Sequence, residues 1–180
     1  MTTVGNQRAF SLLELLISLV LMAVLVNIAI PSFQRILERQ RLTAAAESLY
    51  AQLQLAKVLA LQHKQTIRLS FNLLDADQWC YGLSTSVCDC WQSNSCQLDG
   101  VEHRTQYSEF PGISIAGSTV PWGNGAVFEP RQGNVTAGGA TLASKNFQIR
   151  IKTSGQGRIR ICNDHSLQTK TDLDLYPVCN

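Results

Sequence analysis

The sequence predicts an α+β protein in which a long N-terminal helix packs on a C-terminal antiparallel β-sheet domain. Three observations support this fold class: residues 10–30 are apolar except for one carboxylate, residues 42–60 carry an apolar stripe with helical spacing, and apolar residues alternate beyond residue 65. We therefore expect a membrane or filament helix over 10–30, an amphipathic helix over 31–64 and one β-rich globular domain over 65–180.

The apolar run has the length of a membrane span. About twenty helical residues cross a hydrocarbon core of about 30 Å, and Phe10–Ile30 contains only one ionisable residue, Glu14. A carboxylate at the centre of a bilayer costs roughly 2.5–3.5 kcal/mol, so we expect Glu14 near an interface or beside a positively charged partner. A plain single-pass anchor is the alternative interpretation.

The second part of the helix is predicted by one apolar stripe. Its members recur at alternating spacings of four and three residues: Leu42, Ala46, Leu49, Leu53, Ala56 and Ala60. Charged residues lie off this stripe: Arg39, Glu47, Lys57 and Lys64. We expect the stripe to cover the sheet of the globular domain.

The β-rich region begins with an alternating segment, Thr66–Leu74. Every second residue from Ile67 to Phe71 is apolar and the positions between them are polar, which predicts a strand buried on one side. Further strands are expected in segments separated by Gly, Pro, Ser and Asn: Trp79–Leu83, Gly112–Ala116, Ala126–Phe128, Phe147–Lys152 and Arg158–Cys162.

Six cysteines follow the apolar run: Cys80, Cys88, Cys90, Cys96, Cys162 and Cys179. Four of them lie in a loop over residues 79–99, and their even number is typical of disulfides formed in an oxidising compartment. Zinc binding with His103 or His165 as a further ligand is an alternative, but the C-x-x-C spacing is absent. Reactive thiols are another alternative, and the pairing within the loop is left open.

Positive charge is concentrated in one part of the chain, although the net charge is only +2. There is no acidic residue between Glu129 and Asp164. The alternation predicts a hairpin whose solvent face carries four cations: Arg150, Lys152, Arg158 and Arg160. Such a cluster should attract a polyanion. Cations that are merely exposed to solvent are the alternative.

The chemistry of these residues favours phosphate contacts. Arginine presents a planar fork to phosphate, and Gly157 would let the backbone approach phosphate closely or take a positive φ. No aromatic residue lies among the cations, so we expect binding that is insensitive to base sequence. The histidines lack the context of a catalytic base, and we expect no enzyme, cofactor or metal site.

The N-terminus resembles the processing site of type IV pilins and pseudopilins: a polar leader, a small residue, Phe, a hydroxyl residue, two leucines and Glu precede the apolar run. The resemblance implies that a prepilin peptidase cleaves between Ala9 and Phe10 and removes the leader 1–9, although glycine is usual where Ala9 stands. It also implies that Glu14 neutralises the terminal ammonium of a neighbouring subunit in a filament. Pro31 would bend or locally melt the helix.

Two further motifs resemble the FimT/GspH group of minor pilins and pseudopilins. Residues 128–133 are similar to its F-x-P-x-x-G turn, and residues 157–160 to its G-R-x-R element. The G-R-x-R resemblance, which is to FimT-type minor pilins, implies that double-stranded DNA is bound through its phosphates during natural transformation, by Gly157, Arg158 and Arg160. Arg150 and Lys152 on the same predicted face would extend this DNA-binding track. The pilin resemblance also implies a disulfide between Cys162 and Cys179 that holds the tail 162–180. A structural FimU-like minor pilin or GspH-like type II secretion pseudopilin is the alternative.

The same resemblance implies partners and a location. Other major and minor pilins, the prepilin peptidase and, before assembly, the inner membrane are the expected partners. A count of positive charges would place the globular domain in the cytoplasm, because only Arg8 precedes the span whereas Arg35, Arg39 and Arg41 follow it. The cysteines and the resemblance instead predict a periplasmic globular domain that reaches the cell surface in a pilus.

Overall fold

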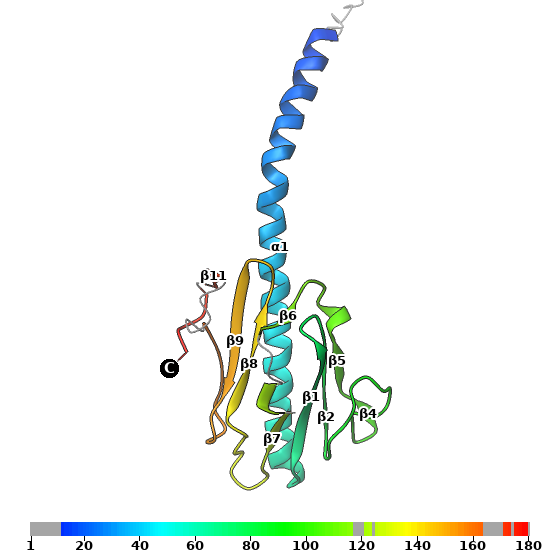
Figure 1. Ribbon diagram of the computed structural model, residues 1–180, viewed down its shortest axis with the longest axis vertical. Helices are drawn as coiled ribbons and strands as arrows, with labels where there is room; N and C mark the ends of the chain where they lie inside the picture. The colour runs from blue at the N-terminus through cyan, green and yellow to red at the C-terminus, as the bar shows by residue number, and fades with distance from the viewer. Residues whose placement is uncertain (1–11, 117–120, 124, 164–170, 174, 180) are drawn as a thin grey trace, which may run out of the picture. The chain divides into compact units, whose positions relative to one another are not determined.

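The computed structural model describes residues 12–116, 121–123, 125–163, 171–173 and 175–179. The chain divides into two units, Met1–Leu37 and Glu38–Asn180. Helix α1 (Leu12–His63) contributes to both units, and the strands follow it in the second (Figure 1).

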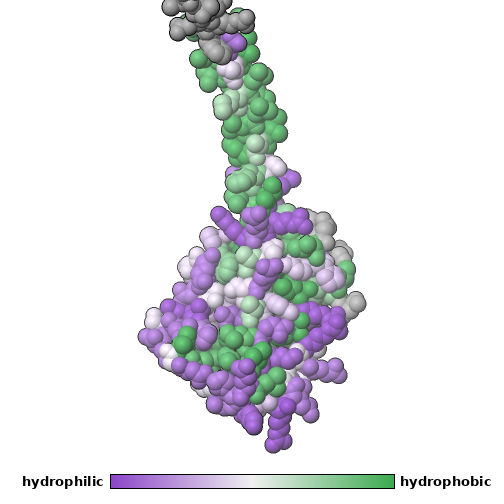
Figure 2. Space-filling model, turned by 180° about the vertical axis from the view of Figure 1, so that it is seen from behind, coloured by the Kyte–Doolittle hydropathy of each residue, from purple (hydrophilic) through white to green (hydrophobic). Residues whose placement is uncertain are grey.

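The first unit contains the apolar part of α1. Its apolar side chains are exposed, from Leu12 to Ile36, and Figure 2 shows them covering this part of the helix. Within the described residues, α1 is the helix whose length and composition suit a membrane span. The helix continues through Pro31, so the local melting implied by the resemblance is not found. Proline removes one backbone hydrogen-bond donor, and the helix spans this position without a break.

The strands of the second unit form two main sheets and a small ribbon. The first sheet is antiparallel and has the order β5 (Arg104–Gln106), β2 (Gln78–Ser84), β1 (Ile67–Asp75) and β7 (Gly125–Phe128). The second has the order β10 (Ile159–Cys162), β9 (Phe147–Thr153), β8 (Gly138–Ala143) and β6 (Ser114–Ile115). One short strand, β11 (Thr171–Asp172), pairs with β9 in parallel.

Short elements lie between these strands along the chain. The ribbon consists of β3 (Gln97–Leu98) and β4 (Val101–Glu102), and the 3-10 helices are η1 (Tyr107–Glu109) and η2 (Pro121–Gly123). The α+β fold class is confirmed. The strands are divided between two main sheets, whereas the sequence had suggested one.

One hydrophobic core joins α1 to both sheets. The predicted stripe is buried in full, together with Ala45, and it belongs to one cluster with Phe71 of the first sheet and Ile151 of the second. Figure 1 shows α1 of this unit running along both sheets. The helix therefore serves as the common support on which both sheets are held.

Two features of the sheets differ from the expectation. Strand β8 was missed because Gly and Ala are weak strand formers, yet a Cβ on Gly138 would lie 2.6 Å from Trp122 Cδ1 and one on Gly139 would lie 2.5 Å from the Ile151 carbonyl. The outer face of β1 is also covered. Ser70 is fully buried because Cys88 of the cysteine loop packs over it and donates its N–H to Ser70 Oγ at 3.1 Å.

Three disulfides hold the loop and the tail. Cys80 pairs with Cys90 and Cys88 with Cys96 in the loop, and Cys162 pairs with Cys179 at the end of the chain. Asn163 also helps to hold the C-terminal tail, because its side-chain amide donates to the carbonyls of Leu173 and Tyr176 at 2.7 Å each. All six cysteine sulfurs are paired, so they are not available as zinc ligands or reactive thiols.

Candidate nucleic-acid interface

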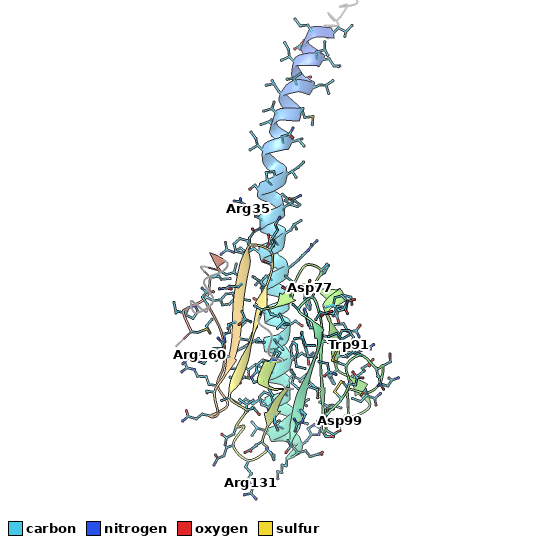
Figure 3. The ribbon with its side chains drawn as sticks, in the orientation of Figure 1. Arg35, Asp77, Trp91, Asp99, Arg131 and Arg160 are labelled. Atoms are coloured by element: carbon cyan, nitrogen blue, oxygen red, sulfur yellow. A yellow bond between two sulfur atoms is a disulfide. The ribbon has the colours of Figure 1, made fainter. Side chains whose placement is uncertain are left out.

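The hairpin formed by β9 and β10 carries the predicted cations on one face. Arg160 lies opposite Lys152, and Cys162 lies opposite Arg150. Directly opposed residues of an antiparallel pair share a face. Arg150, Lys152 and Arg160 therefore belong to the same face, as the alternation had predicted. Figure 3 shows Arg160 on the side of the domain that carries β9, and Trp91 on the side that carries the cysteine loop.

Three of the cations surround a hollow of about 250 Å³. Its lining consists of Lys152, Ser154, Gln156, Arg158, Arg160 and Cys162. Lys152 and Arg158 are exposed, while Arg160 is half-buried. An open hollow with cationic walls can accept an anionic group without burying an unpaired charge.

Arg150 lies on the same face but outside this lining. It is half-buried, and its Nε is 3.3 Å from the position that a Cβ on Gly139 would occupy. Thus Arg150 crosses the neighbouring strand β8 at a residue without a side chain.

The hairpin turn is closed by Gly157. Its φ is +78°, its N–H donates to the Ser154 carbonyl at 2.9 Å, and Ser154 N–H donates to the Arg158 carbonyl at 2.9 Å. This pattern is typical of a three-residue hairpin loop with a left-handed glycine. Of the two roles expected for Gly157, the positive φ is present. Because Gly157 is buried, its backbone faces protein and does not offer an open approach to phosphate.

A second turn, residues 129–133, packs against Gly157. A Cβ on Gly157 would lie 2.1 Å from the Gly133 carbonyl oxygen, and Gly133 itself has a φ of +64°. The two motifs noticed in the sequence therefore meet in space through their glycines. Glycine is required at 157 because a side chain would collide with the Gly133 carbonyl, and it is favoured at 133 because the backbone there has a positive φ.

Helix α1 contributes Lys57 to the same junction. Lys57 Nζ donates to the Gly157 carbonyl at 2.9 Å, and Lys57 Cε is 3.1 Å from the position of a Cβ on Gly133. Sequence reasoning missed this contact, because the pattern showed only that Lys57 lies off the apolar stripe. The sequence signal that could have pointed to this junction is the glycine in each of the two motifs, residues 128–133 and 157–160.

The remaining cations of this region lie on other turns. Arg131 is exposed on the turn after β7, and Lys145 is exposed between β8 and β9. Beside Lys145, Asn146 donates its N–H and its side-chain amide to Glu38 of α1 at 2.6 and 2.7 Å. Burial raises the pKa of Glu38, but hydrogen bonds from Ser144 and Asn146 and the Lys145 charge outweigh it and lower the pKa below its usual value.

Other predicted positions are placed only in part. Ala9 and Phe10 lie outside the described residues, as does His165, whereas Glu14 is exposed in the first turn of α1. His63 Nε2 lies 3.6 Å from Asp99 Oδ2 at the surface. Within the described ranges, no group of His, Cys, Asp and Glu side chains has the arrangement of a metal site.

Comparison with known proteins identifies a family. The family model of type II transport protein GspH matches residues 45–166, and that of the prokaryotic N-terminal methylation motif matches residues 5–29. Among the curated proteins, no sequence matches.

Two crystal structures of the type IV minor pilin FimU from Pseudomonas aeruginosa are similar to this chain. The first is 17% identical, with a TM-score of 0.48, and the match covers 70% of this chain and 91% of that one. The second is 16% identical, with a TM-score of 0.45, and the match covers 68% of this chain and 93% of the other.

Proposed function

This chain belongs to the GspH family, and on that premise we propose that it is a minor pilin that binds double-stranded DNA without sequence preference. The pilin resemblance of the sequence is confirmed at the level of the family, which is one of structural subunits rather than enzymes. The observation that carries the proposal is the open hollow in the β9–β10 hairpin, whose walls include Lys152, Arg158 and Arg160.

The chemistry of the hollow favours phosphate over other partners. Arginine guanidinium groups form paired hydrogen bonds with phosphate oxygens, and Lys152 adds a compact charge. The residues that line the hollow include no aromatic side chain, so bases have no platform on which to stack. Contacts to phosphate alone position a duplex without reading its sequence. Arg150 extends the cationic face at the level of Cys162.

The N-terminal half supplies the setting for this activity. The methylation motif and the apolar helix support a membrane-anchored pilin. In our proposal a prepilin peptidase cleaves between Ala9 and Phe10, and Glu14 then pairs with the terminal ammonium of a neighbouring pilin. The globular domain lies in the periplasm before assembly and at the cell surface in the pilus, where captured DNA serves natural transformation.

A structural role without DNA is the second candidate. The family model describes a type II transport protein, which favours a pseudopilin or FimU-like subunit that primes or caps a filament. In that case the hairpin cations contact another subunit or solvent.

Equilibrium binding of the full-length protein in neutral detergent separates the two candidates. Labelled duplexes of two unrelated sequences are titrated at several salt concentrations. We expect equal affinities for both duplexes and a log affinity that falls linearly with log salt concentration. Absence of binding at low salt would favour the structural role.

A further inference from the structure

The hydrogen bond between Lys57 and the hairpin turn has a consequence for the cations beside it. The Gly157 carbonyl, which accepts from Lys57 Nζ at 2.9 Å, shares a rigid peptide plane with the nitrogen of Arg158. The Arg158 carbonyl is held from the other side by Ser154 N–H at 2.9 Å. The backbone of Arg158 is therefore fixed at both of its peptide units.

Lys57 is suited to this task by its surroundings. It comes from α1, whose neighbouring residues Ala56 and Ala60 are fully buried in the core, so the base of its side chain is anchored. It is half-buried, and in the part of the chain that the structure describes it forms no ion pair with a carboxylate. Its ammonium group is therefore directed at a carbonyl and not at an acid.

We propose that Lys57 is a positioning residue for the DNA-binding hairpin: it fixes the Gly157–Arg158 peptide so that Arg158 is held ready for phosphate. This inference rests on the proposed function. A turn that is already ordered pays less conformational entropy when a ligand binds. Lys57 raises DNA affinity through Arg158 and does not touch the duplex.

The test compares Lys57→Met with wild type in the full-length protein, using duplex affinity as a function of salt concentration. Lys145→Met is the matched control, because it removes an exposed lysine charge at the other end of β9. We expect Lys57→Met to weaken binding by up to about tenfold at fixed salt, because Arg158 must then be ordered when the duplex binds, and ordering one such side chain costs up to about that factor. The salt slope should stay within about 0.3 of wild type, because no phosphate contact is lost.

Two results would overturn the inference. If Lys57 contacts phosphate itself, the magnitude of the slope falls by about 0.9. If Lys57 has no part in binding, Lys57→Met behaves as Lys145→Met does. Lys57→Arg, which keeps the charge and a donor, should bind as wild type. Should Lys57→Met fail to fold, Lys57→Gln replaces it. The glutamine side chain is neutral and one bond shorter than that of lysine, and affinity and salt slope are read in the same way.

A double-mutant cycle with Arg158→Gln separates positioning from an independent effect. Because Lys57 acts through Arg158, its replacement should cost about twofold or less in the Arg158→Gln background. A cost that stays about tenfold would contradict the inference. If Arg158→Gln alone leaves binding unchanged while the protein is folded, the proposed function fails and this inference fails with it; if only the Lys57 variants bind as wild type, the proposed function stands.

Discussion

Gly157 illustrates how a single residue joins the fold to the site. Its left-handed backbone closes the hairpin turn, and its missing side chain lets the Gly133 carbonyl approach. Either requirement alone disfavours other residues. Because Arg158 follows directly, the geometry of the cationic hollow depends on this glycine.

We predict that Gly157→Ala lowers the free energy of unfolding by about 1–3 kcal/mol, the cost of a strained backbone conformation at a non-glycine residue. The control is Gly155→Ala in the same turn, where a Cβ would meet no atom within 4 Å; it should change stability by less than about 0.5 kcal/mol. Chemical unfolding, followed by the fluorescence of the buried Trp79 and Trp122, measures both. Equal stability of the two variants would show that the contact with Gly133 is not tight.

At the scale of elements, α1 holds several loops through polar side chains. Glu38 receives two hydrogen bonds from Asn146 between β8 and β9, and Lys57 donates to the turn between β9 and β10. These two contacts tie both ends of β9 to the helix. Helix α1 also contacts strand β2, where the Ser48 hydroxyl lies 3.0 Å from that of Tyr81; burial raises the pKa of Tyr81 to about 12.

The Glu38 contact should make stability depend on pH. Its folded pKa lies below the reference value of 4.5, so the charged form stabilises the protein above that value, and this stabilisation is lost as the pH falls through the lower folded pKa. Glu38→Gln should therefore be less stable than wild type at neutral pH, with a difference that shrinks in acid. Unfolding midpoints across pH measure it, with the exposed Glu129→Gln as control. A difference that is constant across pH would contradict the role of the charge.

The sequence predicts those elements whose pattern reports burial directly. The apolar stripe of α1 is buried as predicted, and so are the apolar residues Ile67, Leu69 and Phe71 of β1 and Ile149 and Ile151 of β9, because one face of each element packs on the core. The alternation did not show that Ser70 on the other face of β1 is buried as well. Strand β8 was not predicted, because its glycines are explained by close contacts with Trp122 and Ile151, which are distant in sequence. The contact of Lys57 was not predicted for the same reason, since its partner Gly157 lies one hundred residues away in the sequence. Patterning shows which face is buried but not which loop a polar side chain will meet.

For the whole molecule, the apolar part of α1 and the globular unit have separate tasks. The exposed apolar residues of the first unit need a membrane or neighbouring helices. Glu14 is the acid among them, and in our account it finds its partner only in an assembled filament.

We predict that Glu14→Ala leaves the protein in the membrane but impairs its incorporation into pili, because the charge pairing with a neighbouring N-terminus is lost. Quantitative immunoblots of membranes and of sheared, purified pili measure the two pools. Ser18→Ala in the same part of α1 is the control, since Ser18 Oγ donates to the Leu15 carbonyl of its own helix. Wild-type amounts of the Glu14→Ala protein in pili would contradict the prediction.

The central claim, that the hairpin cations hold phosphates, is tested most directly by the salt dependence of DNA binding. The full-length Arg158→Gln/Arg160→Gln variant is compared with Arg39→Gln/Arg41→Gln, which removes two exposed arginine charges from α1. With about 0.9 unit of log–log slope for each neutralised phosphate, the hairpin variant should lose nearly two units of slope and much of its affinity. The control should keep both. A folded hairpin variant with the affinity and slope of the wild type would contradict the account.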